Sequence, residues 1–103
     1  MRQYYEVFIS AENQAQADVI LNSLVDKKLA TGGQFLSSPA RFLWNGAVEE
    51  MDYVTITSFT TSDKKQQLIE DVEMRSAEEV PMIRFVLIEA NQKLAEWITR
   101  TLR

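Results

Sequence analysis

Residues 34–61, Q-F-L-S-S-P-A-R-F-L-W-N-G-A-V-E-E-M-D-Y-V-T-I-T-S-F-T-T, decide the fold of this chain. Asn45-Gly46 divides the stretch and favours a type I′ hairpin turn, because both turn residues then have positive φ. The arms, residues 34–44 and 47–61, are predicted strands of roughly 35–50 Å, whereas the usual strand has about 5–6 residues. Because so long a hairpin overhangs a small domain, we expect its outer part to meet another molecule, most simply a second copy of the chain.

The segments before the hairpin are predicted to form a strand and then a helix. Residues 4–10 carry aromatic and β-branched side chains on both faces, which is typical of an inner strand. Five apolar residues then recur at helical spacing and are expected to face the core: Ala17, Ile20, Leu21, Leu24 and Val25. Thr31-Gly32-Gly33 is predicted to end this helix, because glycine tolerates positive φ.

After the hairpin, residues 62–75 are predicted to form a second helix and residues 82–89 a fourth strand. The helix has an apolar stripe, Leu68, Ile69 and Val72, and its polar residues, Asp71 among them, are expected to face solvent. The strand, M-I-R-F-V-L-I-E, is nearly unbroken in apolar character and is therefore predicted to be central in the sheet. A final helix is expected to turn four residues inward: Leu94, Trp97, Ile98 and Leu102.

The predicted elements follow in the order β-α-β-β-α-β-α. A βαββαβ core is the ferredoxin-like plait, an α+β fold in which two helices cover one face of an antiparallel sheet. The extended β-hairpin and the additional C-terminal helix are added to that plan. The chain has 103 residues, of which 46% are hydrophobic and 25% charged. We therefore expect a single domain over residues 1–103 with a core of its own.

Two residue types are missing, and their absence excludes several classes of function. The chain has no Cys and no His. A disulfide, a thiolate nucleophile, a Ser-His-Asp triad and a Cys or His zinc site are therefore excluded within one chain. We expect no enzyme activity, no catalytic residue and no cofactor. The net charge of −4 argues against binding to nucleic acid.

The hydropathy pattern predicts a cytoplasmic protein without a membrane segment. No apolar run reaches the length of about 18 residues that indicates a membrane helix. The apolar stretch near the N-terminus is short and is interrupted by Glu6, unlike a signal peptide. A chain without Cys forms no disulfide, which is consistent with the reducing cytoplasm.

Four short pieces of the sequence carry a family resemblance. They are L-A at Leu29-Ala30, F-L-W-N-G-A-V-E-E at 42–50, E-V-P at Glu79-Val80-Pro81 and L-A-E-W at 94–97. In their order and spacing, from about Ile9 to the C-terminus, the chain resembles the CutA divalent-cation-tolerance family. The resemblance implies a ferredoxin-like homotrimer whose long strands pair between subunits. It also implies a role in the tolerance of, or response to, divalent metal ions.

The soft and imidazole metal ligands of that family are absent here. Ile9 and Gly32 stand where members carry Cys, and Ser76 stands where the family has His. Copper and zinc favour thiolate and imidazole ligands. The resemblance therefore carries over the scaffold and not copper binding, and only carboxylates and methionine thioethers remain as ligands.

Glu49, Glu50 and Asp52, just past the hairpin turn, are weak candidates for a metal site. Carboxylate oxygens suit Ca²⁺, Mg²⁺ or Mn²⁺. Strand alternation sends Glu49 and Glu50 to opposite faces, so a solvated, charged hairpin tip is the favoured interpretation. Three such tips around a trimer axis would still gather carboxylates.

Trp44, Glu79 and Arg84 are the candidates for a cleft or a subunit junction. Trp44 is expected to pack at a junction between subunits, and stacking on a ligand is the alternative. Glu78 and Glu79, with Arg84, are candidates to line a cleft beside Trp44. The alternative is a helix-to-strand linker with a surface ion pair of little energetic weight.

The sequence thus predicts a non-enzymatic, trimeric CutA-like protein whose partners are its own copies and, weakly, divalent metal ions. The alternative is a small-molecule sensor resembling the PII signalling proteins, which bind nucleotides or metabolites at clefts between subunits. Short loops with few basic residues count against that alternative. A third interpretation is a structural module that has no function beyond forming the trimer.

Overall fold

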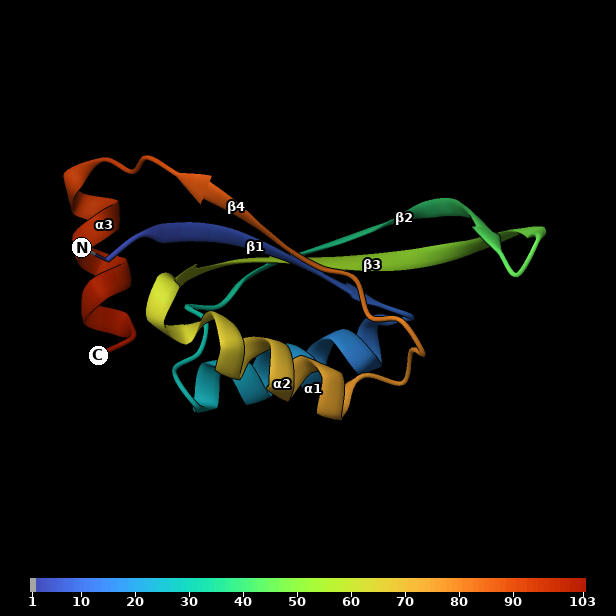
Figure 1. Ribbon diagram of the computed structural model, residues 1–103, viewed down its shortest axis with the longest axis horizontal. Helices are drawn as coiled ribbons and strands as arrows, with labels where there is room; N and C mark the ends of the chain where they lie inside the picture. Colours follow the sequence, from blue (N-terminus) through green and yellow to red (C-terminus); the bar gives the residue numbers. More distant parts are fainter. Residues whose placement is uncertain (1) are drawn as a thin grey trace.

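The computed structural model describes residues 2–103 as one antiparallel sheet with helices α1 and α2 below it (Figure 1). The elements are β1 (Tyr4–Ala11), α1 (Gln14–Asp26), β2 (Gly33–Trp44), β3 (Ala47–Thr61), a 3-10 turn (Ser62–Lys64), α2 (Lys65–Arg75), β4 (Ile83–Ile88) and α3 (Gln92–Thr101). The strand order is β2-β3-β1-β4. This is the predicted ferredoxin-like plait with an extended hairpin and an additional C-terminal helix.

The core lies between the sheet and the two helices. β1 pairs with β3 on one side and with β4 on the other, so the prediction of an inner strand is confirmed. Alternate residues of β1, Val7 and Ile9, are fully buried, because they point toward the helices. They pack with the inward residues of the helices and of β3: Ala17, Ile20, Leu21, Leu24, Val54, Ile56, Leu68 and Val72.

The hairpin of β2 and β3 closes at the predicted turn, where Asn45 has φ 50° and Gly46 has φ 82°. Only residues 54–61 of β3 pair with β1, whereas residues 47–53 pair with β2 alone. The outer part of the hairpin therefore extends beyond the rest of the sheet (Figure 1). This extension makes the molecule elongated, at 44 × 24 × 20 Å.

The two ends of α1 are formed in different ways. The side chain of Asn13 accepts a hydrogen bond of 2.9 Å from the backbone N–H of Gln16 and caps the helix. The helix ends at Asp26, before the predicted glycines, and the positive φ that follows it belongs to Lys28, at 57°. Val25 was expected to face the core but is 45% exposed, because it lies in the last turn beyond the edge of the core.

α2 buries Leu68 and Val72 as predicted, but the prediction for Asp71 is wrong. Its side chain is 5% exposed rather than solvated. The reason is that α1 packs alongside α2 and supplies polar partners to this carboxylate, from Ser23 and Lys27.

β4 lies at an edge of the sheet, so the prediction that it is central is wrong within one chain. It pairs only with β1, and Val86 and Leu87 remain exposed. The topology of the plait puts the last strand at the edge, whatever its composition. The apolar run is therefore left partly uncovered by the chain itself.

α3 lies across the end of the sheet where β1 begins (Figure 1). The hydroxyls of Tyr4 and Thr99 form a hydrogen bond of 2.6 Å that ties the helix to β1. Ile98 and Leu102 are buried as predicted, whereas Trp97 is 38% exposed. Within residues 2–103, no helix is long and apolar enough to cross a membrane.

Candidate functional site

A cavity of about 480 Å³ lies where the outer half of the hairpin meets the connections that leave β1 and enter β4. Both strands of the hairpin, the residue after β1 and the linker between α2 and β4 contribute to its wall. The lining residues are Glu12, Phe42, Leu43, Trp44, Glu49, Met51, Tyr53, Glu78, Glu79, Val80 and Met82. The cavity thus joins segments that are far apart in the sequence.

One part of the wall is aromatic. The rings of Phe42 and Tyr53 meet edge to face, with centroids 5.4 Å apart and planes at 69°. Tyr53 is buried, whereas Trp44 next to the turn keeps 38% of its surface exposed. An apolar surface of this kind favours a ligand, or a neighbouring protein surface, that carries apolar groups.

Another part of the wall is acidic, and Ser10 holds one of its carboxylates, that of Glu78, in place. The buried Ser10 hydroxyl donates a hydrogen bond of 2.8 Å to Oε1 of Glu78 and accepts one of 2.8 Å from the backbone N–H of Met82. Burial raises the pKa of Glu78, and the charge of Glu12 raises it further, while the hydrogen bond from Ser10 opposes the rise. The Glu78 carboxylate is therefore fixed in position but costly to ionise.

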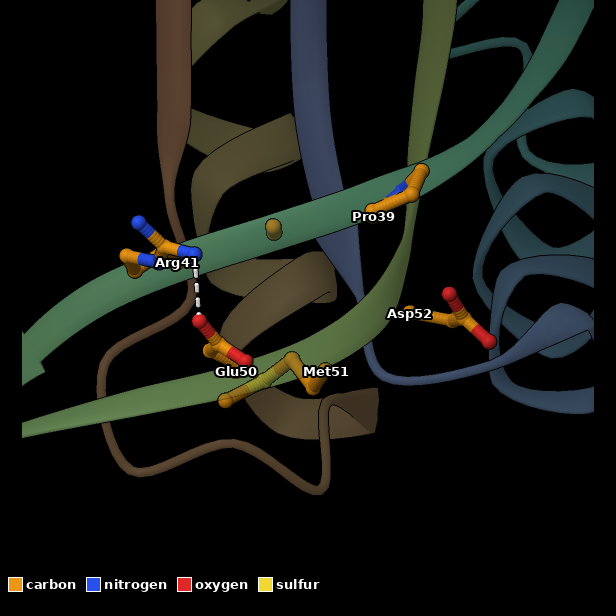
Figure 2. A pocket seen from close by; sticks show the side chains of 6 residues that line it. Pro39, Arg41, Glu50, Met51 and Asp52 are labelled. Atoms are coloured by element: carbon orange, nitrogen blue, oxygen red, sulfur yellow. Dashed lines mark ion pairs between the residues drawn. The ribbon is translucent and has the colours of Figure 1, made fainter.

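The carboxylates predicted as weak metal ligands are divided between two places. Glu49 lines the cavity beside Trp44, whereas Glu50 and Asp52 line a second, open concavity of about 540 Å³. Figure 2 shows this concavity, in which Arg41 on β2 is turned toward Glu50 on β3 and forms an ion pair with it. Asp52 points away from that pair. Over residues 2–103, no group of three or more acidic side chains comes together as a metal site would require.

The other predicted site residues are also distributed unevenly. Trp44 and Glu79 both line the cavity, and Glu78 joins them. Arg84 is outside that lining, and its guanidinium carbon lies 4.7 Å from the ring centroid of Phe8, on the sheet. Within one chain Arg84 therefore does not line the cavity with Trp44, and its place at a cleft or subunit junction stays a prediction.

Sequence reasoning did not single out several residues of the wall, among them Glu12, Tyr53 and Met82. Glu12 lies directly after an inner strand, which puts it at the end of the sheet. Tyr53 was counted only as a strand former. Met82 was assigned to the strand and in fact precedes it. For Glu12 and Met82 the useful signal was position at a strand end, where connections converge, whereas Tyr53 lies inside β3.

Comparison with known proteins identifies similar chains. A family model described as CutA1 divalent ion tolerance protein matches residues 5–101. The solved structure of the periplasmic divalent cation tolerance protein CutA from Archaeoglobus fulgidus has a TM-score of 0.92 and 24% identity, covering 97% of this chain and 99% of that one. CutA1 from Oryza sativa has a TM-score of 0.92 and 20% identity, covering 98% and 94%.

A third similar structure is the divalent cation tolerance protein from Thermus thermophilus. Its TM-score is 0.86 and its identity 25%, covering 91% of this chain and 93% of that one. Among curated proteins, no sequence matches.

Proposed function

The chain belongs to the CutA1 divalent ion tolerance family, and from this membership we propose that it is a non-enzymatic homotrimer that serves in tolerance of, or response to, divalent metal ions. The overhanging hairpin is the observation that carries the proposed assembly. Residues 47–53 of β3 have a strand partner on one side only, and that partner is β2. Backbone donors and acceptors left free along such an edge favour pairing with another chain.

Exposed apolar side chains support the same proposal. At the hairpin tip Leu43 is 75% exposed and Val48 64% exposed. At the opposite edge of the sheet, Val86 and Leu87 on β4 are exposed as well. Clusters of exposed apolar surface mark interaction sites. The free side of β3 at residues 47–53 and the outer edges of β2 and β4 fit an assembly in which each copy covers an edge of the next.

The proposed relation to metal ions rests on the family and on the ligands that this chain offers. With no Cys and no His in the sequence, oxygen-loving ions such as Mg²⁺, Ca²⁺ and Mn²⁺ suit it better than copper or zinc. Weak sites would draw on Glu49, Glu50 and Asp52 from several hairpins gathered in the trimer. A non-enzymatic role is supported by the same lack of a histidine base and a cysteine nucleophile.

Two measurements on protein with its purification tag removed test this proposal. Light scattering at micromolar concentration should give about three times the chain mass of 11.9 kDa, and a monomer mass would overturn the assembly. Calorimetry should find no submicromolar Cu²⁺ or Zn²⁺ site and at most weak binding of Mg²⁺ or Mn²⁺. A tight, stoichiometric copper site would overturn the ligand argument and require a site of thioethers and shared carboxylates.

A PII-like sensor of small molecules is the second candidate, and the 480 Å³ cavity is the observation that favours it. The acidic lining counts against nucleotides. A thermal shift panel of nucleotides and metals separates the two functions, because a ligand at about 100 Kd stabilises by about 2.7 kcal/mol. We propose a cytoplasmic location for either function, and cell fractionation tests it.

A further inference from the structure

We propose that the cavity beside Trp44 is a binding site for a small organic cation, an ammonium or guanidinium group carried on an apolar body. The cavity is built by residues of a single chain. The proposal therefore needs no residue of a second subunit and no role in metal tolerance.

The charge of the lining selects a cation. Four carboxylates border the cavity: Glu12, Glu49, Glu78 and Glu79. Across residues 2–103, no lysine or arginine joins them in its wall. An anion would meet uncompensated negative charge in a partly enclosed space, whereas a cation gains charge-assisted hydrogen bonds. Glu78 is held in place by Ser10, so one acceptor is already oriented before a ligand arrives.

The aromatic wall selects an organic cation over a bare ion. A positive group within about 6 Å of an aromatic ring is attracted by the electrons of its face, and tryptophan is the best such ring. Trp44, Phe42 and Tyr53 supply three rings to one wall. A contact between a cation and aromatic rings also occurs elsewhere in this chain. Nζ of Lys65 lies 4.4 Å from the ring centroid of Tyr5 and 4.9 Å from that of Phe85.

A metal ion fits this cavity less well. Ca²⁺ requires about six to eight oxygen ligands within about 2.6 Å, and Mg²⁺ demands near-octahedral geometry. The described chain gathers no group of three acidic side chains close enough for that. Met51, Met82 and Val80 complete the lining with apolar surface. A ligand with a hydrocarbon body uses this surface, whereas a hydrated metal ion does not.

Binding of phenethylammonium tests the proposal, with fluorescence of Trp44 as the readout. Trp97→Phe leaves Trp44 as the one tryptophan, since the sequence has two. We expect saturable binding with a Kd of about 1 mM, an ordinary value for a ligand of this size. 2-Phenylethanol and 3-phenylpropionate, which have the same ring but a neutral or negative end, should bind at least tenfold more weakly. NaCl at matched ionic strength should leave the emission unchanged.

The neighbouring residues Glu49 and Glu50 provide a matched pair of variants. Glu49→Gln and Glu79→Gln should each weaken phenethylammonium binding about threefold or more, and together about tenfold. Glu50→Gln should have no effect, because Glu50 lines the other concavity and pairs with Arg41. Circular dichroism and thermal melting confirm that each variant is folded, and calorimetry on the wild-type chain gives the affinity independently of fluorescence.

Three results would overturn the proposal: no saturable binding up to about 10 mM, equal binding of the neutral or negative analogue, or equal weakening by Glu50→Gln and Glu49→Gln. A monomer mass or the absence of a metal response would instead contradict the proposed family role and leave this site standing.

Discussion

The hydroxyl of Ser23 on α1 donates a hydrogen bond of 2.7 Å to the buried carboxylate of Asp71 on α2. The ammonium group of Lys27 donates to the other oxygen of the same carboxylate, and Nε of Arg75 lies 3.7 Å from it. Nε of Arg75 also donates to the Ser23 hydroxyl, at 3.0 Å. The two helices that cover the sheet are thus joined to each other by a polar cluster as well as by the core.

Replacing Asp71 with Ala should destabilise the protein in a pH-dependent way. Burial would raise the pKa of Asp71, but hydrogen bonds from Lys27 and Ser23 and nearby positive charge outweigh it and hold the pKa below its usual value. A depressed pKa in the folded state stabilises the fold above the unfolded pKa of about 3.9, and this contribution is lost as the pH falls through the folded pKa.

We therefore expect Asp71→Ala to lose about 2 kcal/mol at pH 7, as for hydrogen bonds to a charged group, and much less near pH 2. Urea unfolding at both pH values, at one fixed protein concentration, measures the difference. Glu70→Ala, at an exposed position of the same helix, is the control and should change stability little. An equal loss at both pH values would show that the cluster acts through packing rather than charge.

Replacing Glu78 with Gln should stabilise the folded protein, whereas Asp71→Ala should destabilise it. Because the pKa of Glu78 is raised, chiefly by burial, its ionised form destabilises the folded state above the folded pKa. This penalty disappears as the pH falls below the unfolded pKa of about 4.3. Gln keeps an oxygen that accepts the hydrogen bond from Ser10. Glu78→Gln should therefore stabilise by at most about 1 kcal/mol at pH 7–8 and by nothing near pH 3.5. Thermal melting that shows destabilisation at pH 8 would refute this account.

Two glycines in the hairpin should differ sharply in their tolerance of Ala. A Cβ at Gly33 would lie 1.7 Å from the backbone oxygen of Thr57, so the paired strands would have to separate. Gly46 has open space around it and a φ of 82°, so Ala there meets only backbone strain.

We expect Gly46→Ala to cost about 1–2 kcal/mol and Gly33→Ala to cost about 3 kcal/mol or more, at or above the upper end of the range for overpacking. The midpoints of denaturant unfolding of the two variants show which substitution destabilises the protein more. A smaller loss for Gly33→Ala than for Gly46→Ala would mean that β2 relaxes away from β3 without penalty.

Trp44→Ala should weaken the proposed trimer before it unfolds the chain. Trp44 lies on the overhanging part of the hairpin, and its exposed portion is available to a neighbouring subunit. Truncation of a buried aromatic side chain costs about 3–5 kcal/mol, and this loss would recur at each junction. Sedimentation across a dilution series should show dissociation of the variant at concentrations where the wild type stays assembled.

Val25→Ala removes an exposed apolar side chain from α1 and should leave the assembly unchanged. A Trp44→Ala protein that remains trimeric with unaltered melting would remove Trp44 from the interface. The role of Trp44 in ligand binding would then be the remaining one.

The sequence predicted the parts of the fold that depend on local patterns. Asn45-Gly46 located the turn, and both residues have the positive φ that this turn needs. β4 shows where local pattern stops being informative. Its apolar run indicates burial, but the pattern does not say whether the same chain or another one covers it, and the topology puts β4 at an edge.

The candidate site was harder to predict, because it depends on contacts between distant residues. Ser10 and Glu78 are 68 positions apart, yet their hydrogen bond holds one carboxylate of the acidic wall in place. Trp44 and Glu79, two of the candidates named from the sequence, line the same cavity. Asp71 was misplaced because helical periodicity treats a charged residue as solvated and contains no information about a partner on α1.

The central place of β1 also determines when the chain can fold during its synthesis. Ile9 pairs with Ile56 on one side and with Ile83 on the other. Protein synthesis proceeds at about 5–20 residues per second. The later partner, Ile83, is therefore made roughly 4–15 s after β1 is complete. The hairpin, in contrast, pairs neighbouring segments through a favourable turn, so both of its strands have been made before β4 is synthesised. The pairing of β1 with β4 is therefore the last strand pairing of the sheet that synthesis allows.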